Sequence, residues 1–371
     1  DEISAEIAAS VIRECGLGAF NMLEFNQYMS GKIARMYTSI SETSESMGGS
    51  TTPKDFEALL EQVYAHFMHP RVNKEGLQIY KDKQKTWLEN KKLDHQSAFR
   101  DTVNVTLTNH HPRRRPFDMS LLEEANIERI KEIYNERFNN ASDFTFLFVG
   151  NINPEKVKPL IEKYIASLPS TGKKEHWKDL GITAPEGPIK KVVKNKMKVP
   201  KGTVQVVFTG DLPYSLKNEI ALDALTDILD VRYTETIREE QGGTYGVGVY
   251  SRLEKEPKNK FSIVITFNCD PENVDKLTKI VYEEIDKIKD NGPEQKYLDN
   301  SIKNRLKERD EKDKQNNSWL TNLKLFYTGK NSYIGETYKK MVSDLNENNI
   351  KEIAHAVFKD SFKYEFVLLP E

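Results

Sequence analysis

The chain has 371 residues, of which 37% are hydrophobic and 30% charged, and its 55 Lys and Arg residues nearly balance its 57 Asp and Glu residues, for a net charge of −2. This balance gives no basic field that would favour a nucleic acid partner, and two cysteines are too few for a disulfide framework or a cysteine metal site. No apolar run reaches the roughly 18 residues of a membrane span, and a chain of this length predicts two domains.

The predicted elements of the first half begin with a helix over residues 5–15. A second helix opens at residues 52–55, Thr-Pro-Lys-Asp, which supply a cap, a proline at the first helical position and an acid in the first turn. Its apolar residues form one stripe over residues 56–67. A further amphipathic helix contains residues 130–133, and the alternating run at 144–149 predicts a buried strand.

The second half begins with two strand-like runs, at residues 189–194 and 203–209. A helix that ends near Ile237 then leads into a glycine-rich segment and another strand. Residues 270–272, Asp-Pro-Glu, open the next helix with a cap, a proline and an acid. The charged run at 303–314 predicts the solvated face of a long helix.

The two halves repeat each other. Residues 350–353 read Ile-Lys-Glu-Ile, as residues 130–133 do, and both runs precede an alternating strand, so their offset is 220 (350 − 130). The prolines that open the capped helices, Pro53 and Pro271, differ by 218 (271 − 53). The repeat predicts an α+β fold of two homologous domains, each a mainly antiparallel sheet packed with helices.

The repeat also predicts the domain boundaries. The first domain covers residues 1–167, a linker covers 168–188, and the second domain covers 189–371. Counting back from Ile189 gives −31 (189 − 220), so the first domain lacks the equivalent of its two opening strands. A sheet without two strands exposes edges and apolar faces, which soluble domains avoid. We therefore expect the chain to be cut from a longer polypeptide, or another segment to complete the first sheet.

No zinc site is predicted in this chain. A helical zinc peptidase site needs two histidines one turn apart, with a glutamate beside one of them. His66 and His69 are three residues apart but have no acidic neighbour, so an ordinary pair at a helix end is the simpler interpretation. The Glu-His run at 175–176 has Gly172 where an inverted motif needs its first histidine. The sequence therefore predicts no metal ligand and no cofactor here.

Two other runs raise the question of a binding role. The run His-His-Pro-Arg-Arg-Arg-Pro at 110–116 could meet an anionic partner, but its two prolines favour an exposed loop. The run at 241–250 is rich in glycine, as phosphate loops are. A phosphate loop, however, runs from a strand into a helix, whereas here a helix runs into the glycines. Nucleotide binding is thus disfavoured, while glycines in a strand allow another backbone to lie close.

The run Arg-Glu-Glu-Gln-Gly-Gly-Thr-Tyr-Gly-Val at 238–247 resembles the signature in the C-terminal half of pitrilysin-family zinc metallopeptidases, the inverzincins. Residues 149–152 and the run Asn-Ser-Trp-Leu at 317–320 resemble other recurring segments of that family. The likeness covers essentially the whole chain and is closest to large bacterial zinc proteases. It implies two domains per half, two halves that close like a clamshell around a peptide, and a periplasmic or secreted location.

The resemblance further implies which half holds the metal. The family's zinc motif, His-x-x-Glu-His with a distant Glu, belongs to the N-terminal half, and the helix at 5–15, which matches its position, lacks such ligands. Zinc is therefore expected in an N-terminal half, in the same polypeptide or in a partner chain. The family's Arg/Tyr pair falls on Arg238 and Tyr245, implied to contact the substrate and to stabilise oxyanion charge beside the metal. The residues implied to make main-chain contacts to an extended peptide are Gly242, Gly243, Thr244 and Gly246.

These implications lead to one function and one alternative. The chain is expected to be the non-zinc-binding, substrate-contacting half of a metallopeptidase, inactive alone. The alternative is a non-catalytic partner subunit or peptide-binding protein of the same superfamily, since some relatives divide the two halves between chains. Simpler roles for the pair also stay open, because Arg238 can cap the preceding helix and Tyr245 can pack within its strand.

Overall fold

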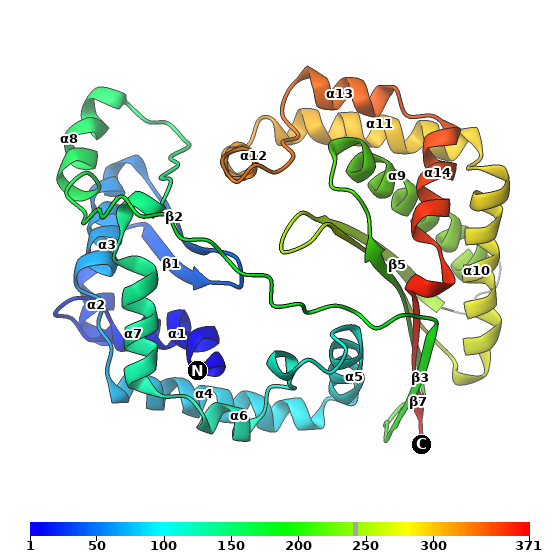
Figure 1. Ribbon diagram of the computed structural model, residues 1–371, viewed down its shortest axis with the longest axis horizontal. Helices are drawn as coiled ribbons and strands as arrows, with labels where there is room; N and C mark the ends of the chain where they lie inside the picture. Colours follow the sequence, from blue (N-terminus) through cyan, green and yellow to red (C-terminus); the bar gives the residue numbers. More distant parts are fainter. Residues whose placement is uncertain (240–243) are drawn as a thin grey trace. The chain divides into compact units, whose positions relative to one another are not determined.

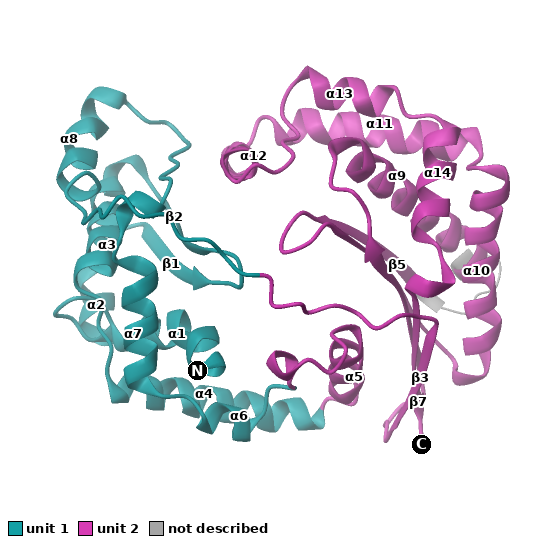
Figure 2. Ribbon diagram, viewed as in Figure 1, with its two compact units in different colours: residues 1–93, 116–178 teal, residues 94–115, 179–371 magenta. Residues whose placement is uncertain are grey.

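The computed structural model describes residues 1–239 and 244–371, with the side chains of residues 238, 239, 244 and 245 outside the description. The chain divides into two compact units, one of Asp1–Leu93 with Pro116–Lys178 and one of Asp94–Arg115 with Asp179–Glu371 (Figure 2). Both units contain helices and strands, so the predicted α+β class is confirmed. None of the described helices is long and apolar enough to cross a membrane.

The second unit is built on one five-stranded sheet (Figure 1). Its strands are β3 (Ile189–Asn195), β4 (Gly202–Asp211), β5 (Thr244–Glu254), β6 (Lys260–Cys269) and β7 (Lys363–Pro370). Their order across the sheet is β3-β7-β4-β6-β5. The last strand, β7, lies parallel to β3 and antiparallel to β4, and the other neighbours are antiparallel. The sheet is therefore mixed, with β3 and β5 at its edges.

Local sequence sets the ends of the helices in this unit. The helices are α5 (Ser97–Leu107), α9 (Leu216–Tyr233), α10 (Val274–Asn291), α11 (Gln295–Lys312), α12 (Asn316–Tyr327), α13 (Glu336–Ser343) and α14 (Glu347–Val357). The side chain of Ser215 accepts a hydrogen bond from the Asn218 N–H and caps α9. Gly292, with φ of 73°, ends α10 in the left-handed conformation that glycine allows.

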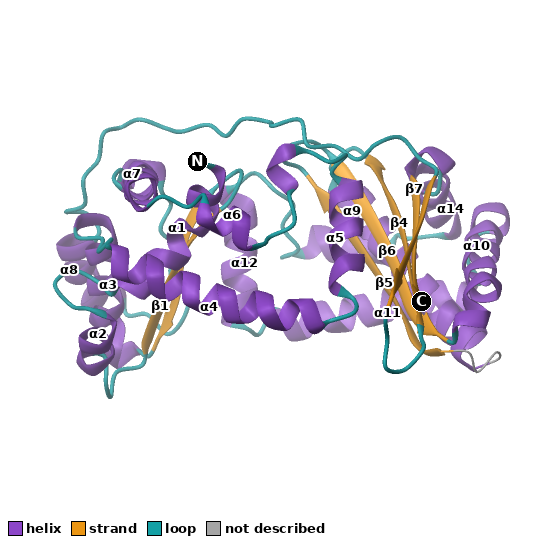
Figure 3. Ribbon diagram, turned by 90° about the horizontal axis from the view of Figure 1, so that it is seen from below, coloured by secondary structure: helices purple, strands orange, loops and turns teal. Residues whose placement is uncertain are grey.

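Both faces of the five-stranded sheet are covered. Alternate residues of a strand point to opposite faces, so in β7 Val367 packs in the main core with α9, α10 and α14, whereas Phe366 packs with Phe99 of α5. Figure 3 shows α5 on one side of the strands and α10 and α14 on the other. Residues 94–115 thus fall in the second unit, although they lie within the range 1–167 that the repeat assigns to the first domain.

The first unit is mainly helical. Its elements are α1 (Glu2–Cys15), α2 (Met22–Tyr28), β1 (Ala34–Ile40), β2 (Glu45–Thr51), α3 (Phe56–Met68), α4 (Lys74–Leu93), α6 (Met119–Glu123), α7 (Ile127–Phe138) and α8 (Pro154–Tyr164). The strands β1 and β2 form an antiparallel hairpin, with Ala34 opposite Thr51. The core lies around α1, whose Ile7 and Val11 are buried together with Leu122 of α6 and Ile130 of α7.

The strand predicted at residues 144–149 is wrong for this structure. The rings of Phe144 and Phe146 pack 5.2 and 6.2 Å from the ring of Phe67 in α3, but the segment joins neither described sheet. The matching strand of the second unit, β7, is held between β3 and β4. Within the described residues of the first unit the strands are β1 and β2, so nothing pairs with residues 144–149 on either side. An alternating apolar pattern becomes a strand only where neighbours complete its hydrogen bonds.

The order of elements nevertheless repeats between the units. A helix, two antiparallel strands and a proline-led 3-10 turn precede the next helix in both, the turns being Pro53–Asp55 before α3 and Pro271–Asn273 before α10. The first residues of these turns differ by 218 (271 − 53), and those of α7 and α14 differ by 220 (347 − 127). The offsets are those found in the sequence.

Candidate functional site

The residues singled out in the sequence lie where α9 leads into β5. A short π-helical turn, Thr234–Glu239, continues α9, and β5 follows after residues 240–243. The main chain of Arg238 is therefore near the end of this turn, and that of Tyr245 is near the start of β5. Outside the described residues are Gly242, Gly243 and the side chains of Arg238, Thr244 and Tyr245. The contacts of the Arg238 and Tyr245 side chains stay a prediction.

Buried contacts hold the π-helical turn in place. Ile237 is fully buried, and the hydroxyl of the buried Thr236 donates to the carbonyl of Arg232 at 2.8 Å. Tyr233, the last residue of α9, is also fully buried and donates from its hydroxyl to a carbonyl of α10 at 3.2 Å. The core thus fixes the main chain up to the residue before Arg238. Single π-helical turns within α-helices occur frequently at functional sites.

The strand β5 is an edge strand, because its one neighbour in the sheet is β6. Its register is irregular between Thr244 and Val247, and a Cβ added at Gly246 would meet nothing within 4 Å. The outer side of an edge strand can accept an added strand. At Val249, however, the N–H donates to Asp230 Oδ1 of α9 at 3.3 Å. An added peptide therefore has to pair nearer the start of β5 or displace Asp230.

A row of carboxylates on α9 was not identified in the sequence. Asp223, Asp227 and Asp230 are spaced by four and three residues and so share one face of the helix. Arg305 of α11 lies 3.4 Å from Asp223 and 2.6 Å from Asp227, and Ser251 of β5 donates to Asp223 at 3.0 Å. Burial raises the pKa of Asp223 above its ordinary value, with Arg305 opposing this. The row joins α9 to β5 and α11. The helical spacing of three aspartates within an otherwise apolar helix is the sequence signal that could have identified it.

His66 lies in α3, and His69 is the C-cap residue that follows this helix. His66 Nδ1 lies 2.8 Å from the Tyr134 hydroxyl of α7, while His69 is exposed. In α1, the helix that the resemblance places at the position of the zinc motif, the Cys15 thiol donates to the carbonyl of Val11 at 3.3 Å. The side chains described in this chain therefore do not fit the His-x-x-Glu-His zinc site.

Three carboxylates of the first unit, Glu45, Asp143 and Glu175, have oxygens within 4.8 Å of one another. Protein groups compensate part of the negative charge of these carboxylates, since Arg137 forms an ion pair with Glu175 and the Glu175 N–H donates to Asp143 at 3.2 Å. Burial raises the pKa of Glu45, with Arg137 opposing this. Carboxylates alone suit hard cations rather than the histidine-rich site of a zinc peptidase.

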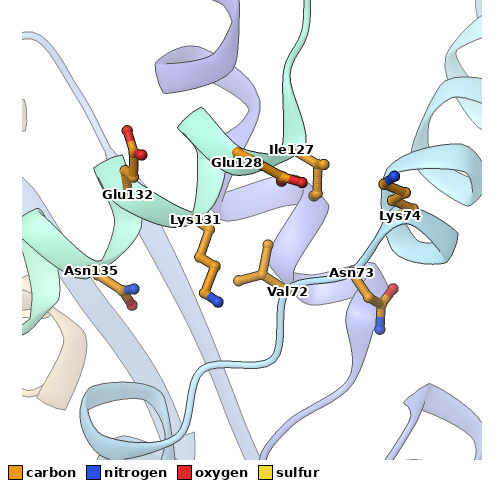
Figure 4. Close-up of a pocket in the computed structure, with 8 residues that line it drawn as sticks. All are labelled: Val72, Asn73, Lys74, Ile127, Glu128, Lys131, Glu132 and Asn135. Carbon is orange, nitrogen blue, oxygen red and sulfur yellow. The ribbon is translucent and has the colours of Figure 1, made fainter.

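An open pocket of about 600 Å³ lies in the first unit, between the start of α7 and the segment that leads into α4 (Figure 4). Its lining residues are Val72, Asn73, Lys74, Ile127, Glu128, Lys131, Glu132 and Asn135. Lys131 and Val72 point into a common space, whereas Glu132 points away from it. Two lysines and two glutamates leave the lining without a dominant charge. The pocket contains none of the residues predicted from the sequence, all of which belong to the second unit.

Comparison with known sequences identifies related proteins. Residues 124–305 match the family described as the peptidase M16 inactive domain. The chain is 24% identical over 299 residues to the "Probable zinc protease PqqL" of Haemophilus influenzae, an alignment that covers 78% of this chain and 31% of that protein. It is 26% identical over 226 residues to the "Zinc protease PQQL-like" of Arabidopsis thaliana, which covers 56% of this chain and 23% of that protein. The chain therefore spans less than a third of the length of either relative.

Solved structures share the fold. The periplasmic protease PqqL from Escherichia coli superposes with a TM-score of 0.82 at 18% identity, over 100% of this chain and 42% of that chain. The peptidase M16 inactive domain from Pseudomonas fluorescens superposes with a TM-score of 0.79 at 16% identity, over 99% of this chain and 88% of that chain. At these identities the likeness establishes the fold.

Proposed function

Since this chain carries a peptidase M16 inactive domain and is homologous to bacterial PqqL-type zinc proteases, we propose that it is the substrate-contacting half of a zinc metalloendopeptidase. Residues 1–167 and 189–371 are two homologous domains, and the first lacks the strand pair that β3 and β4 supply to the second. Zinc is held by an N-terminal half, in the same polypeptide or in a partner chain. A peptide is cleaved in the chamber that the two halves enclose.

The observation that carries this proposal is that the end of the signature run, residues 244–247, opens the edge strand β5. β5 is paired on one side only, so its glycine-rich start can lie against the backbone of an extended peptide. Gly242, Gly243, Thr244 and Gly246 are the residues proposed to make these contacts. Arg238 and Tyr245 flank the same short segment, where a guanidinium and a phenol can donate hydrogen bonds to carbonyl oxygens of the substrate and to a developing oxyanion.

The function is tested by mixing this chain with a zinc-bearing N-terminal half and measuring cleavage of a quenched fluorescent peptide. We expect no cleavage by this chain alone and cleavage by the mixture. Loss of one donor to an oxyanion costs about 10²-fold or more, so Arg238→Ala and Tyr245→Phe should each lower kcat/KM by about that factor. Matched controls on the same strand are Arg252→Ala and Tyr250→Phe, because both side chains are exposed on β5, and these should retain wild-type rates.

Two results would count against the proposal. Zinc-dependent cleavage by this chain alone would contradict the assignment of the metal to the other half. Equal rates for Arg238→Ala, Tyr245→Phe and the wild type would leave the pair with a packing role. If peptide binds but no mixture cleaves it, the chain acts as a non-catalytic peptide-binding subunit.

A further inference from the structure

Arg232, in the last turn of α9, is the centre of a polar cluster directly before the π-helical turn. Its Nε donates to Glu284 Oε2 of α10 at 2.8 Å, and its Nη1 donates to the Tyr297 hydroxyl of α11 at 2.9 Å. Glu284 and Tyr297 are 2% and 5% exposed, so this contact lies within the packed unit. Burial alone would raise the pKa of Glu284, but the hydrogen bonds from Arg232 and Lys287 outweigh it and lower that pKa.

The cluster extends into the π-helical turn through one residue. Glu235 Oε2 accepts a hydrogen bond from Arg232 Nη1 at 3.2 Å and a second one from the Tyr297 hydroxyl. Glu235 is the second residue of the turn Thr234–Glu239, which ends at the main chain of Arg238 and Glu239. Hydrogen bonds that join charged groups are the stronger ones in proteins. Two bonds to the charged Glu235 therefore attach the turn to Arg232 of α9 and to Tyr297 of α11, close to the predicted substrate-contacting residues.

Burial separates two roles within this cluster. The Glu284 side chain is 3% exposed and keeps the Arg232 charge compensated inside the unit, so its loss would destabilise the fold. The Glu235 side chain is 38% exposed. If Glu235 is neutralised, Arg232 keeps its bond to Glu284 and the core keeps its charge balance. The contribution of Glu235 is therefore to the conformation of the turn more than to the stability of the unit.

We infer that Glu235, held by Arg232 and Tyr297, is a positioning residue that sets the π-helical turn, and with it Arg238, for binding an extended peptide. This inference rests on the proposed function. It adds a residue that touches no substrate and acts through the backbone of the turn. It also explains the use of a π-helical turn, which needs specific support to persist next to an α-helix.

The test is binding of a fluorescein-labelled, unstructured casein peptide to the full chain, followed by fluorescence anisotropy. Loss of one charge-assisted hydrogen bond is expected to raise the Kd for Glu235→Gln about fivefold to tenfold, with an unchanged melting temperature. The matched control is Lys287→Gln. Lys287 also bonds to this cluster, at 2.6 Å from Glu284, and is 61% exposed, but this ion pair lies within α10 rather than on the turn. This variant should keep the wild-type Kd.

The double variant Glu235→Gln with Arg238→Ala separates positioning from general stability. If Glu235 acts through Arg238, the double variant should have the same Kd as Arg238→Ala alone. The inference is overturned if Arg238→Ala weakens binding while Glu235→Gln does not, or if the effects of the two substitutions on the binding free energy add. It is also overturned if Glu235→Gln lowers the melting temperature as it raises the Kd. In those cases the proposed function survives. If the wild type binds no peptide, or binds it as Arg238→Ala does, the proposed function fails and the inference fails with it.

Discussion

His66 links the stability of the first unit to pH. Its Nδ1 is 2.8 Å from the hydroxyl of Tyr134, which is fully buried. Burial lowers the pKa of His66 from its ordinary 6.5 to about 4. A positive charge on the ring would lie beside the buried ring of Tyr134, whose centroid is 6.4 Å away. The folded unit therefore keeps His66 neutral, whereas the unfolded chain protonates it in mild acid.

We expect the first unit to lose stability as the pH falls from about 6.5 to about 4. In this window the unfolded state binds the proton and the folded state does not, so stability rises with pH. The separation of the two pKa values corresponds to roughly 3 kcal/mol at most. Urea unfolding can be followed by tryptophan fluorescence in a Trp319→Phe background, which leaves Trp87 and Trp177, both in the first unit.

His66→Leu should lose most of this pH dependence, because it removes the group that titrates. His69→Gln is the matched control, since His69 lies in the same helix end and is exposed. This variant should follow the wild-type curve. The same slope in His66→Leu and the wild type would show that other groups cause the acid sensitivity.

At the residue scale, the sequence indicates the protein family better than it indicates which residues contact each other. The run at 238–247 was sufficient to suggest the peptidase family, because its residue types and spacing are specific. The bond from His66 to Tyr134 joins residues 68 positions apart, and that from Asp230 to Val249 crosses from a helix to a strand. Neither is encoded in local spacing. Both depend on how the elements pack.

At the scale of elements, Gly76 allows α4 to lie close against α1. A Cβ added at Gly76 would lie 2.2 Å from the Cys15 sulfur and 3.1 Å from the Cys15 Cα. Alanine favours a helix over glycine by about 1 kcal/mol, whereas overpacking of this kind costs about 1–3 kcal/mol. The clash involves backbone as well as a short side chain, so the cost should exceed the gain.

Gly76→Ala is therefore expected to destabilise the first unit by about 1 kcal/mol, measured by urea unfolding with the same tryptophan probes. The substitution should cost less in a Cys15→Ala background, because the nearest atom is then absent. Equal costs in the two backgrounds would show that the sulfur is not what limits the approach of the helices. A stabilising Gly76→Ala would contradict the close approach itself.

Capped helices with a clear apolar stripe were the elements best predicted from sequence. Pro53 and Pro271 each begin a 3-10 turn directly before a helix, as their positions predicted. Thr52 caps the first turn by accepting from the Asp55 N–H, whereas Asp270 makes no side-chain cap bond at the second. The segment at 144–149 failed because strand formation needs neighbours that an alternating pattern does not reveal. Packing of α5 on the second unit was equally hidden. The apolar residues Phe99 and Val103 show that α5 has a face to bury, but not which sheet that face meets.

At the scale of the whole molecule, metal removal separates this chain from its proposed partner half. Among the described residues, the one group of three carboxylates whose oxygens lie within 4.8 Å of one another is partly neutralised by Arg137, and no histidine belongs to it. We expect EDTA to leave the melting temperature of this chain unchanged, measured by differential scanning calorimetry. Metal analysis of the purified chain should find zinc well below one ion per chain. The mixture with a zinc-bearing half should lose its peptidase activity on the same treatment.

A drop in melting temperature with EDTA would contradict this expectation. If Glu45→Gln abolished that drop, the metal would belong to the carboxylates Glu45, Asp143 and Glu175. A drop that persists in Glu45→Gln would point to ligands elsewhere in the chain.

For the molecule as a whole, one nearly constant offset recurs in both the sequence and the order of elements, while the two homologous domains that it implies stay a prediction. The α+β class that the repeat implies was also predicted correctly. The division into units was harder to foresee. It depends on contacts made by residues 94–115, which the sequence pattern alone assigns to their neighbours in the chain.

The position of β7 in the sheet has a consequence for protein synthesis. β3 has β7 as its one neighbour in the sheet, and Ile189 of β3 is made long before Tyr364, its partner in register. While the ribosome translates the intervening helices, β3 has no strand to join and β4 lacks a neighbour on one side. Pairings this distant in sequence form late and slowly. The second unit of a nascent chain therefore stays incomplete, and open to chaperones, until residues 363–370 leave the ribosome.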